Sequence, residues 1–200
     1  MNPPNKYLLS FTGASLFINA SVTIAEVYLE LKDWDLVKEK VISENLLQYR
    51  TESSLKRVYL ELWPRLNQLT DEQLELLIEG SPQEQKQILW FAICQRYAYI
   101  REFAIEVVHE KFLRMDYSLT DYDYDVFFNR KADWHEELDN IADSTRQKIR
   151  SVLFLMLRQT NIISEEQHIL PAIFTARVRE ALRPEAPLSF QIFPTTISTE

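Results

Sequence analysis

Glycine is almost absent from this chain. Only two glycines, Gly13 and Gly80, occur among its 200 residues. Phosphate-binding loops of the P-loop and dinucleotide type need several closely spaced glycines, so the sequence excludes both classes. The abundance of Leu, Glu, Gln, Lys and Arg favours helices over a turn-rich β architecture. We therefore predict an all-α fold, a compact multi-helix bundle with at most one short β-hairpin.

Cysteine is equally scarce, and long apolar runs are missing. The single cysteine, Cys94, lies in an apolar stretch and has no second cysteine in the chain to pair with. No apolar run reaches the roughly 18 to 20 residues that a bilayer-spanning helix needs. The N-terminal segment also lacks the cleavage pattern of a signal peptide. We expect a cytoplasmic protein with no membrane contact and an inert core thiol.

Catalytic and metal-binding signatures are missing too. The three histidines, His109, His135 and His168, are far apart, and none has a cysteine or second histidine at ligand spacing. The aspartates of the segment 121–125 lack the glycine and the glutamate of a calcium loop. Because no catalytic motif occurs either, we predict no enzyme activity, no cofactor, no metal and no small-molecule substrate.

Helix-start signals are frequent. Thr70 with Gln73 and Thr120 with Asp123 have the spacing of capping boxes, and Ser81-Pro82-x-Glu84 combines a cap with a proline at the first helical position. Between residues 88 and 108 the chain is apolar on nearly all sides, which is typical of a buried helix. We expect one long or two closely joined helices there, with aromatic core residues Trp90, Phe91, Tyr97, Phe103 and Phe112.

Charge is unevenly distributed. The net charge is −8, which by itself argues against nucleic-acid binding. Residues 144–183, however, hold seven Lys and Arg against three Asp and Glu, whereas residues 119–143 hold two against eight. Such local asymmetry is more informative than the total. The sequence thus has one clearly cationic block, which directly follows the most acidic one.

The cationic block begins with an amphipathic pattern. At about 100° per residue, Ile149, Val152, Leu153 and Met156 fall on one side of a helix. Ser144 with Gln147 predicts its start, and Asn161 predicts a left-handed stop. Two very short strands can follow, Ile162–Ile163 and His168–Leu170. This pattern predicts a winged-helix-like subdomain, although an ordinary amphipathic helix with a solvated basic face has the same pattern.

We divide the chain into an N-terminal helical domain (1–116), a C-terminal winged-helix-like domain with one short β-hairpin (117–183) and an extended tail (184–200). The apolar tail residues Phe190, Ile192 and Phe193 are docked if they find a groove and frayed if they do not. Basic side chains on the predicted helix, with a second group near the chain's start, are the candidate nucleic-acid contacts: Arg146, Lys148, Arg150, Arg158, Arg50, Lys56 and Arg57.

Two long blocks resemble a known family. The run from Tyr7 to Val58, YLLSFTGASLFINASVTIAEVYLELKDWDLVKEKVISENLLQYRTESSLKRV, and the run FFNRKADWHEELDNIADSTRQKIRSVLFLMLRQTNIIS from Phe127 to Ser164 are similar to the BrxA family of BREX bacteriophage-defence systems. The resemblance covers nearly the whole chain apart from the tail. It implies a mostly helical accessory protein acting beside the defence methyltransferase and ATPase, and a likeness to the RNA-binding antitermination factor NusB.

Two hypotheses follow. The first is a non-enzymatic protein of a phage-defence system that binds double-stranded DNA with low sequence specificity, or RNA in the manner of NusB. The second is a protein–protein adaptor that docks other BREX subunits, through the acidic block Asp121 to Asp143 or through the apolar tail. Fold analogy alone does not choose between them.

Overall fold

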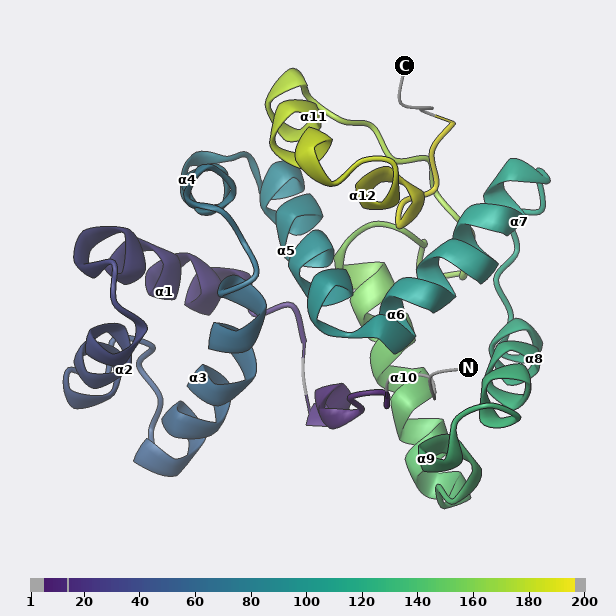
Figure 1. Ribbon diagram of the computed structural model, residues 1–200, viewed down its shortest axis with the longest axis horizontal. Helices are drawn as coiled ribbons and strands as arrows, with labels where there is room; N and C mark the ends of the chain where they lie inside the picture. The colour runs from purple at the N-terminus through teal and green to yellow at the C-terminus, as the bar shows by residue number, and fades with distance from the viewer. Residues whose placement is uncertain (1–5, 14, 197–200) are drawn as a thin grey trace. The chain divides into compact units, whose positions relative to one another are not determined.

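In this computed structural model, residues 6–13 and 15–196 are described, and every regular element among them is a helix (Figure 1). The predicted all-α class is confirmed. The chain forms two compact units that interleave in sequence. Unit 1 comprises Met1–Ser15, Tyr97–Ile173 and Leu182–Glu200, and unit 2 comprises Leu16–Arg96 and Phe174–Ala181. The predicted domains 1–116 and 117–183 stay a prediction, because packing within one structure does not test whether either segment folds alone.

Unit 2 is a bundle built around α5 (Pro82–Arg96). Asp33, Thr51 and Thr70 cap helices, each side chain accepting a hydrogen bond from a backbone N–H of the first turn. Helix α5 packs against three other helices, and its seven-residue apolar run, residues 88–94, includes the buried Trp90 and Cys94. The helices are α1 (Ile18–Leu31), α2 (Trp34–Ser43), α3 (Glu52–Leu66), α4 (Asp71–Glu79), α5 (Pro82–Arg96) and most of α11 (Ala176–Leu182).

Two buried side chains hold α11 within unit 2. The Glu84 carboxylate accepts hydrogen bonds from the Ser81 amide at 2.8 Å and from the Thr175 hydroxyl at 2.6 Å. The Gln73 amide donates to the Ala181 carbonyl oxygen at 2.8 Å. Both Glu84 and Gln73 also complete the capping boxes predicted from the sequence. Capping groups therefore serve tertiary packing as well as helix initiation, which spacing alone does not reveal.

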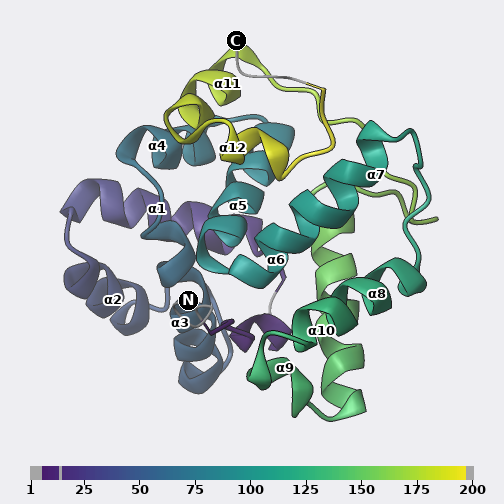
Figure 2. The ribbon, with the colours of Figure 1, turned by 45° about the vertical axis from the view of Figure 1, so that its right-hand side comes forward.

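Unit 1 is organised around one long interrupted helix and α10 (Asp143–Gln159). The segments α6 (Ala98–Phe103), η2 (Ala104–His109) and α7 (Glu110–Leu113) are continuous, and η2 is a π-helix. Phe103 packs edge-to-face on Phe127 and lies 6.3 Å from Phe154 between ring centres. α8 (Asp121–Ala132) and α10 lie beside the long helix in the two ribbon views (Figure 1 and Figure 2). The other elements are η1 (Ser10–Gly13), α8 (Asp121–Ala132), α9 (Glu136–Asp139), α10 (Asp143–Gln159), η3 (Arg183–Glu185) and α12 (Leu188–Gln191).

The predicted β-hairpin and its winged-helix subdomain are not supported. Among the described residues there is no strand, and Ile163 and Ile169 form only an isolated antiparallel bridge. The amides of Ile162 and Ile163 both bond to the Leu157 carbonyl and so complete the end of α10. Pro171 has no amide to continue the pairing. Ile162 and Pro171 lie at the same open end of the pairing, so the ladder does not extend beyond the bridge between Ile163 and Ile169.

The tail is docked in unit 1, but it is not extended throughout. Phe190, Ile192 and Phe193 are buried, and the first of them belongs to the short helix α12. The Ala172 amide donates to the Pro194 carbonyl at 2.8 Å, which attaches the end of the described chain. Burial of these apolar side chains holds residues 188–194 in place. Of the two predicted alternatives, the tail is therefore docked rather than frayed.

Candidate nucleic-acid interface

The candidate interface is built on α10. Its core side is formed by the side chains that the amphipathic pattern predicts, with Ile149, Leu153 and Met156 fully buried. The predicted capping box of Ser144 and Gln147 is wrong, because α10 begins at Asp143 with Ala142 as its N-cap. The Ala142 carbonyl accepts the Arg146 amide at 3.0 Å, so Ser144 already lies within the first turn of the helix. The predicted stop is confirmed, since Asn161 has φ 58°.

Arg146 and Arg150 lie on the flank of α10 that faces α8. The Arg146 guanidinium is 2.7 Å from the Asp125 carboxylate, and Arg150 is 3.2 Å from Asp121 and 3.9 Å from Asp125. Both arginine side chains are about three-quarters covered, with 25% and 26% of their surface exposed. Because each pair of residues is spaced by one helical turn, the four groups form a ladder between the two helices. These arginines are therefore already partly neutralised.

A small open cavity separates the two helices. Its volume is about 300 Å³, and it is lined by Tyr124, Asp125, Asp143, Arg146, Gln147 and Arg150. The Arg146 guanidinium also stacks on the Phe128 ring at 4.3 Å, which fixes the position of its charge. Burial raises the pKa of Tyr124 to about 12, so its hydroxyl is neutral at physiological pH. The cavity can therefore offer two guanidinium groups to an anion, provided that the anion displaces the carboxylates.

The other two cations of α10 are placed differently. Lys148 is exposed and lies about 200° around the helix from Arg146, on the outward side. No ion pair of Lys148 is found with any described residue. Arg158, near the C-terminal end, is 3.7 Å from Glu165 and 26% exposed. The structure thus brings Arg146 and Arg150 together, while Lys148 and Arg158 lie apart from them.

The second predicted group belongs to unit 2. Arg50 is exposed and lines a cavity of about 370 Å³ between the end of α2 and the start of α3. Lys56 is paired with Glu52 at 2.5 Å on the exposed side of α3, and Arg57 is exposed beside it. An exposed pair of this kind contributes little to stability. These side chains are thus accessible to solvent.

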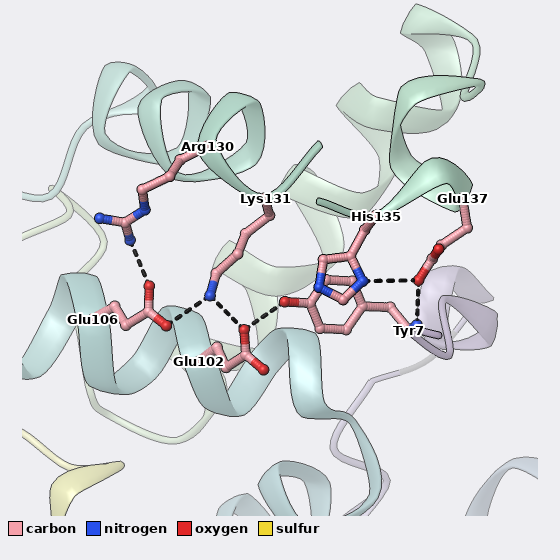
Figure 3. Close-up of polar contacts among 7 residues, drawn as sticks. All are labelled: Tyr7, Glu102, Glu106, Arg130, Lys131, His135 and Glu137. Atoms are coloured by element: carbon pink, nitrogen blue, oxygen red, sulfur yellow. Dashed lines mark hydrogen bonds and ion pairs between the residues drawn. The ribbon is translucent and has the colours of Figure 1, made fainter. Parts of the chain in front are cut away.

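Sequence inspection missed a polar network in unit 1 (Figure 3). The Lys131 ammonium lies between two carboxylates of the long helix, 2.5 Å from Glu102 and 2.7 Å from Glu106. Arg130 reaches the other oxygen of Glu106 at 2.5 Å. Since Glu106 lies in the π-helical turn, α8 is fixed at the point where the long helix departs from regular geometry.

Tyr7 extends this network to the N-terminal segment. Its hydroxyl donates to Glu102 at 2.5 Å, its backbone amide donates to Glu137, and its ring stacks on His135 at 3.8 Å. Burial, and then the hydrogen bond to Glu102, raise the pKa of Tyr7. Although burial alone acts to raise the pKa of Glu137, hydrogen bonds including that from the Tyr7 amide lower it overall. No local pattern links residues 95 and 130 positions apart, so no signal in the sequence identifies the network.

Within residues 6–13 and 15–196, no group of three or more His, Cys, Asp or Glu side chains is arranged to hold a metal ion. In the same part of the chain, none of the helices has both the length and the apolar character that crossing a bilayer requires.

Comparison with known sequences gives the family. A profile of the BrxA family matches residues 5–185. The chain belongs to the BrxA family. A protein of Bacillus cereus (strain H3081.97) named "BREX protein BrxA" is 31% identical over 131 residues, 66% of this chain and 66% of that protein. Another of the same name from Escherichia coli O9:H4 (strain HS) is 26% identical over 76% of this chain and 71% of that protein. The first match therefore spans just under two thirds of its relative.

A solved structure has the same fold as this BrxA-family chain. It is the crystal structure of an uncharacterized protein from Magnetospirillum magneticum, with a TM-score of 0.80 and 23% identity. The match covers 94% of this chain and 99% of that one. At this identity the likeness concerns the fold alone. It indicates that the helical arrangement is shared by a protein whose sequence has diverged widely.

Proposed function

We propose that this chain is a non-enzymatic component of a BREX defence system that binds nucleic acid, double-stranded DNA in the first place. The proposal is supported by membership of a family whose relatives are named as BREX proteins. The contacts assigned to phosphate are Arg146, Lys148, Arg150 and Arg158 on α10, with Arg50, Lys56 and Arg57 in unit 2. Other BREX components, such as the methyltransferase and the ATPase, are the proposed protein partners, in the cytoplasm.

One observation carries the proposal. Arg146 and Arg150 lie at the edge of an open cavity, and their carboxylate partners are themselves well exposed, Asp121 at 56% and Asp125 at 42%. Exposed carboxylates are held weakly, so a phosphate can replace them on the arginines. Arginine forks bind phosphate oxygens in a bidentate manner, which fixes register but does not read sequence. Low sequence specificity follows from this kind of contact.

The test is a fluorescence-anisotropy titration of the whole chain with matched duplex DNA and RNA probes at several salt concentrations. Each phosphate contact contributes about −0.9 to the slope of log K against log salt on duplex DNA. With Arg146 and Arg150 engaged we expect a slope of about −2 or steeper. The double variant Arg146→Glu with Arg150→Glu should lose most of the affinity while its helicity is unchanged.

The matched control for the single variant Arg146→Glu has the same charge change elsewhere in unit 1. Arg114 is 77% exposed at the end of α7 and pairs only loosely with Glu110, at 3.3 Å. Arg114→Glu should therefore leave binding nearly unaltered. Equal losses in Arg146→Glu and Arg114→Glu would mean that only net charge matters, and an unaltered titration curve of the double variant would refute the α10 assignment. Tighter binding to the RNA probe would favour the NusB-like alternative.

A further inference from the structure

The outward side of α8 has exposed aromatic and aliphatic side chains. Tyr122 and Val126, one helical turn apart, are 75% and 48% exposed, and Trp134, which directly follows the helix, is 73% exposed. The opposite side of α8 is buried through Tyr124 and Phe127. Thus α8 packs on unit 1 by one side only, and its apolar residues on the other side do not contribute to the core.

Three carboxylates close to Trp134 in the sequence have no cationic partner among the described residues. Asp133, Glu136 and Asp139 are all exposed, and none has an ion pair within the described part of the chain. By contrast, Asp121 and Asp125 on the same helix are paired with arginines of α10. The negative charge is thus concentrated at the C-terminal end of α8 and on α9.

Neither feature stabilises the fold. Asp133 is the C-cap of α8, where the partial negative charge of the helix end disfavours another anion. An exposed tryptophan forgoes the burial of roughly 200 Å² of surface. Residues that are unfavourable for the isolated chain, yet are gathered at one place, are typical of a surface that is covered by a partner.

We propose that the acidic aromatic surface, formed by Tyr122, Val126, Asp133, Trp134, Glu136 and Asp139, docks a lysine- and arginine-rich segment of another protein. Carboxylates attract the cationic side chains, and the open face of Trp134 accepts a guanidinium or ammonium group by a cation–π contact. The long methylene stems of the same residues cover Tyr122 and Val126. A basic segment therefore satisfies both the charged and the apolar parts of the surface.

The negative charge of this surface disfavours two other occupants, nucleic acid and a second copy of the chain. Phosphate groups of nucleic acid carry the same sign as the surface and are repelled by it. A second copy of the chain, meeting this surface through a two-fold axis, would oppose carboxylates to carboxylates. The proposed docking is therefore independent of nucleic-acid binding by α10, and either can fail without the other.

Photo-crosslinking tests the proposal in the cells from which the chain comes. Benzoylphenylalanine replaces Trp134 in the full-length protein, and the crosslinked peptide is identified by mass spectrometry. We expect an adduct with a Lys- and Arg-rich segment of another protein. No adduct, or an adduct with nucleic acid, with a second copy or with a segment that is not basic, overturns the proposal.

Charge-reversal variants give the quantitative test. Asp133→Lys with Glu136→Lys should reduce the adduct yield about tenfold or more, since like charges across an interface are strongly unfavourable. The matched control is Glu72→Lys with Glu75→Lys, two exposed carboxylates with the same three-residue spacing on α4. Asp133→Asn with Glu136→Gln replaces the reversal variant if that one loses helicity. An equal yield in the variant and the control overturns the proposal.

Discussion

Replacing Asp125 by Asn should strengthen nucleic-acid binding. The Asp125 carboxylate neutralises Arg146 at 2.7 Å and approaches Arg150 at 3.9 Å, so a phosphate must compete with it for both guanidinium groups. Asn keeps the size and an acceptor oxygen but removes the charge. The expected gain is opposite in sign to the effect of most substitutions at a binding surface.

Its magnitude follows from Coulomb's law. Because the Asp125 side chain is 42% exposed, a water-like dielectric applies, and two unit charges 4 Å apart then interact by about 1 kcal/mol. Removing that repulsion from an incoming phosphate lowers Kd by about fivefold. The effect should shrink at high salt, because exposed charges are screened over roughly 8 Å at physiological ionic strength.

Anisotropy titration of a duplex DNA probe at two salt concentrations measures the change. Asp133→Asn is the matched control, since it removes the same charge from the other end of α8, where no arginine is paired with it. That variant should change Kd much less. If Asp125→Asn leaves the affinity unchanged or weakens it, the carboxylate does not compete with phosphate and the reasoning is refuted.

Three further predictions concern stability. Hydrogen bonds, first that from Thr175, lower the pKa of Glu84 in the folded chain. The ionised carboxylate therefore adds stability above its unfolded pKa of about 4.3, and this stability is lost as the pH falls. Glu84→Gln should lower Tm at pH 7 and much less at pH 3.5, and equal losses at the two pH values would contradict this. Tyr7→Phe leaves Glu102 one hydrogen-bond donor short and should lower the free energy of unfolding in urea by about 1.5 to 3 kcal/mol. The control Tyr122→Phe, at an exposed site, should be neutral. Equal effects of the two variants would disprove a role for the network. Phe103→Ala, at a fully buried site, should cost about 3 to 5 kcal/mol by the same assay, and a cost below 1 kcal/mol would show that this packing is not formed.

Helix starts were predicted well where the signal is local. Thr70 with Gln73 and Thr120 with Asp123 form the capping boxes that their spacing indicates. A capping box needs only a side chain and two backbone amides within one turn, so a few consecutive residues contain all its parts. Ser144 has the same spacing to Gln147 but lies inside α10, which starts at Asp143. Spacing shows where a helix can start, and the chain around it selects among the possible starts.

The prediction of a β-hairpin was wrong for a related reason. Residues 162–170 have suitable side chains for two short strands, but pairing depends on free backbone groups. The amides of Ile162 and Ile163 are used by α10, and those of Ile169 and Leu119 bond between residues 117–119 and 167–169. Because residues 117–119 lie some fifty residues before residues 167–169, no local pattern could have shown that these two segments pair with each other.

The sequence by itself determined the helical class, most helix starts and the burial of α5, because these depend on glycine content, on capping within one turn and on apolar periodicity. It also contained the charge asymmetry between residues 119–143 and 144–183. Only the tertiary structure decided that Arg146 and Arg150 face Asp125 and Asp121, while Asp133 and Glu136 form no ion pair with any residue that the structure describes. Charges interact according to which helices pack together, and helix packing is a property of the whole fold.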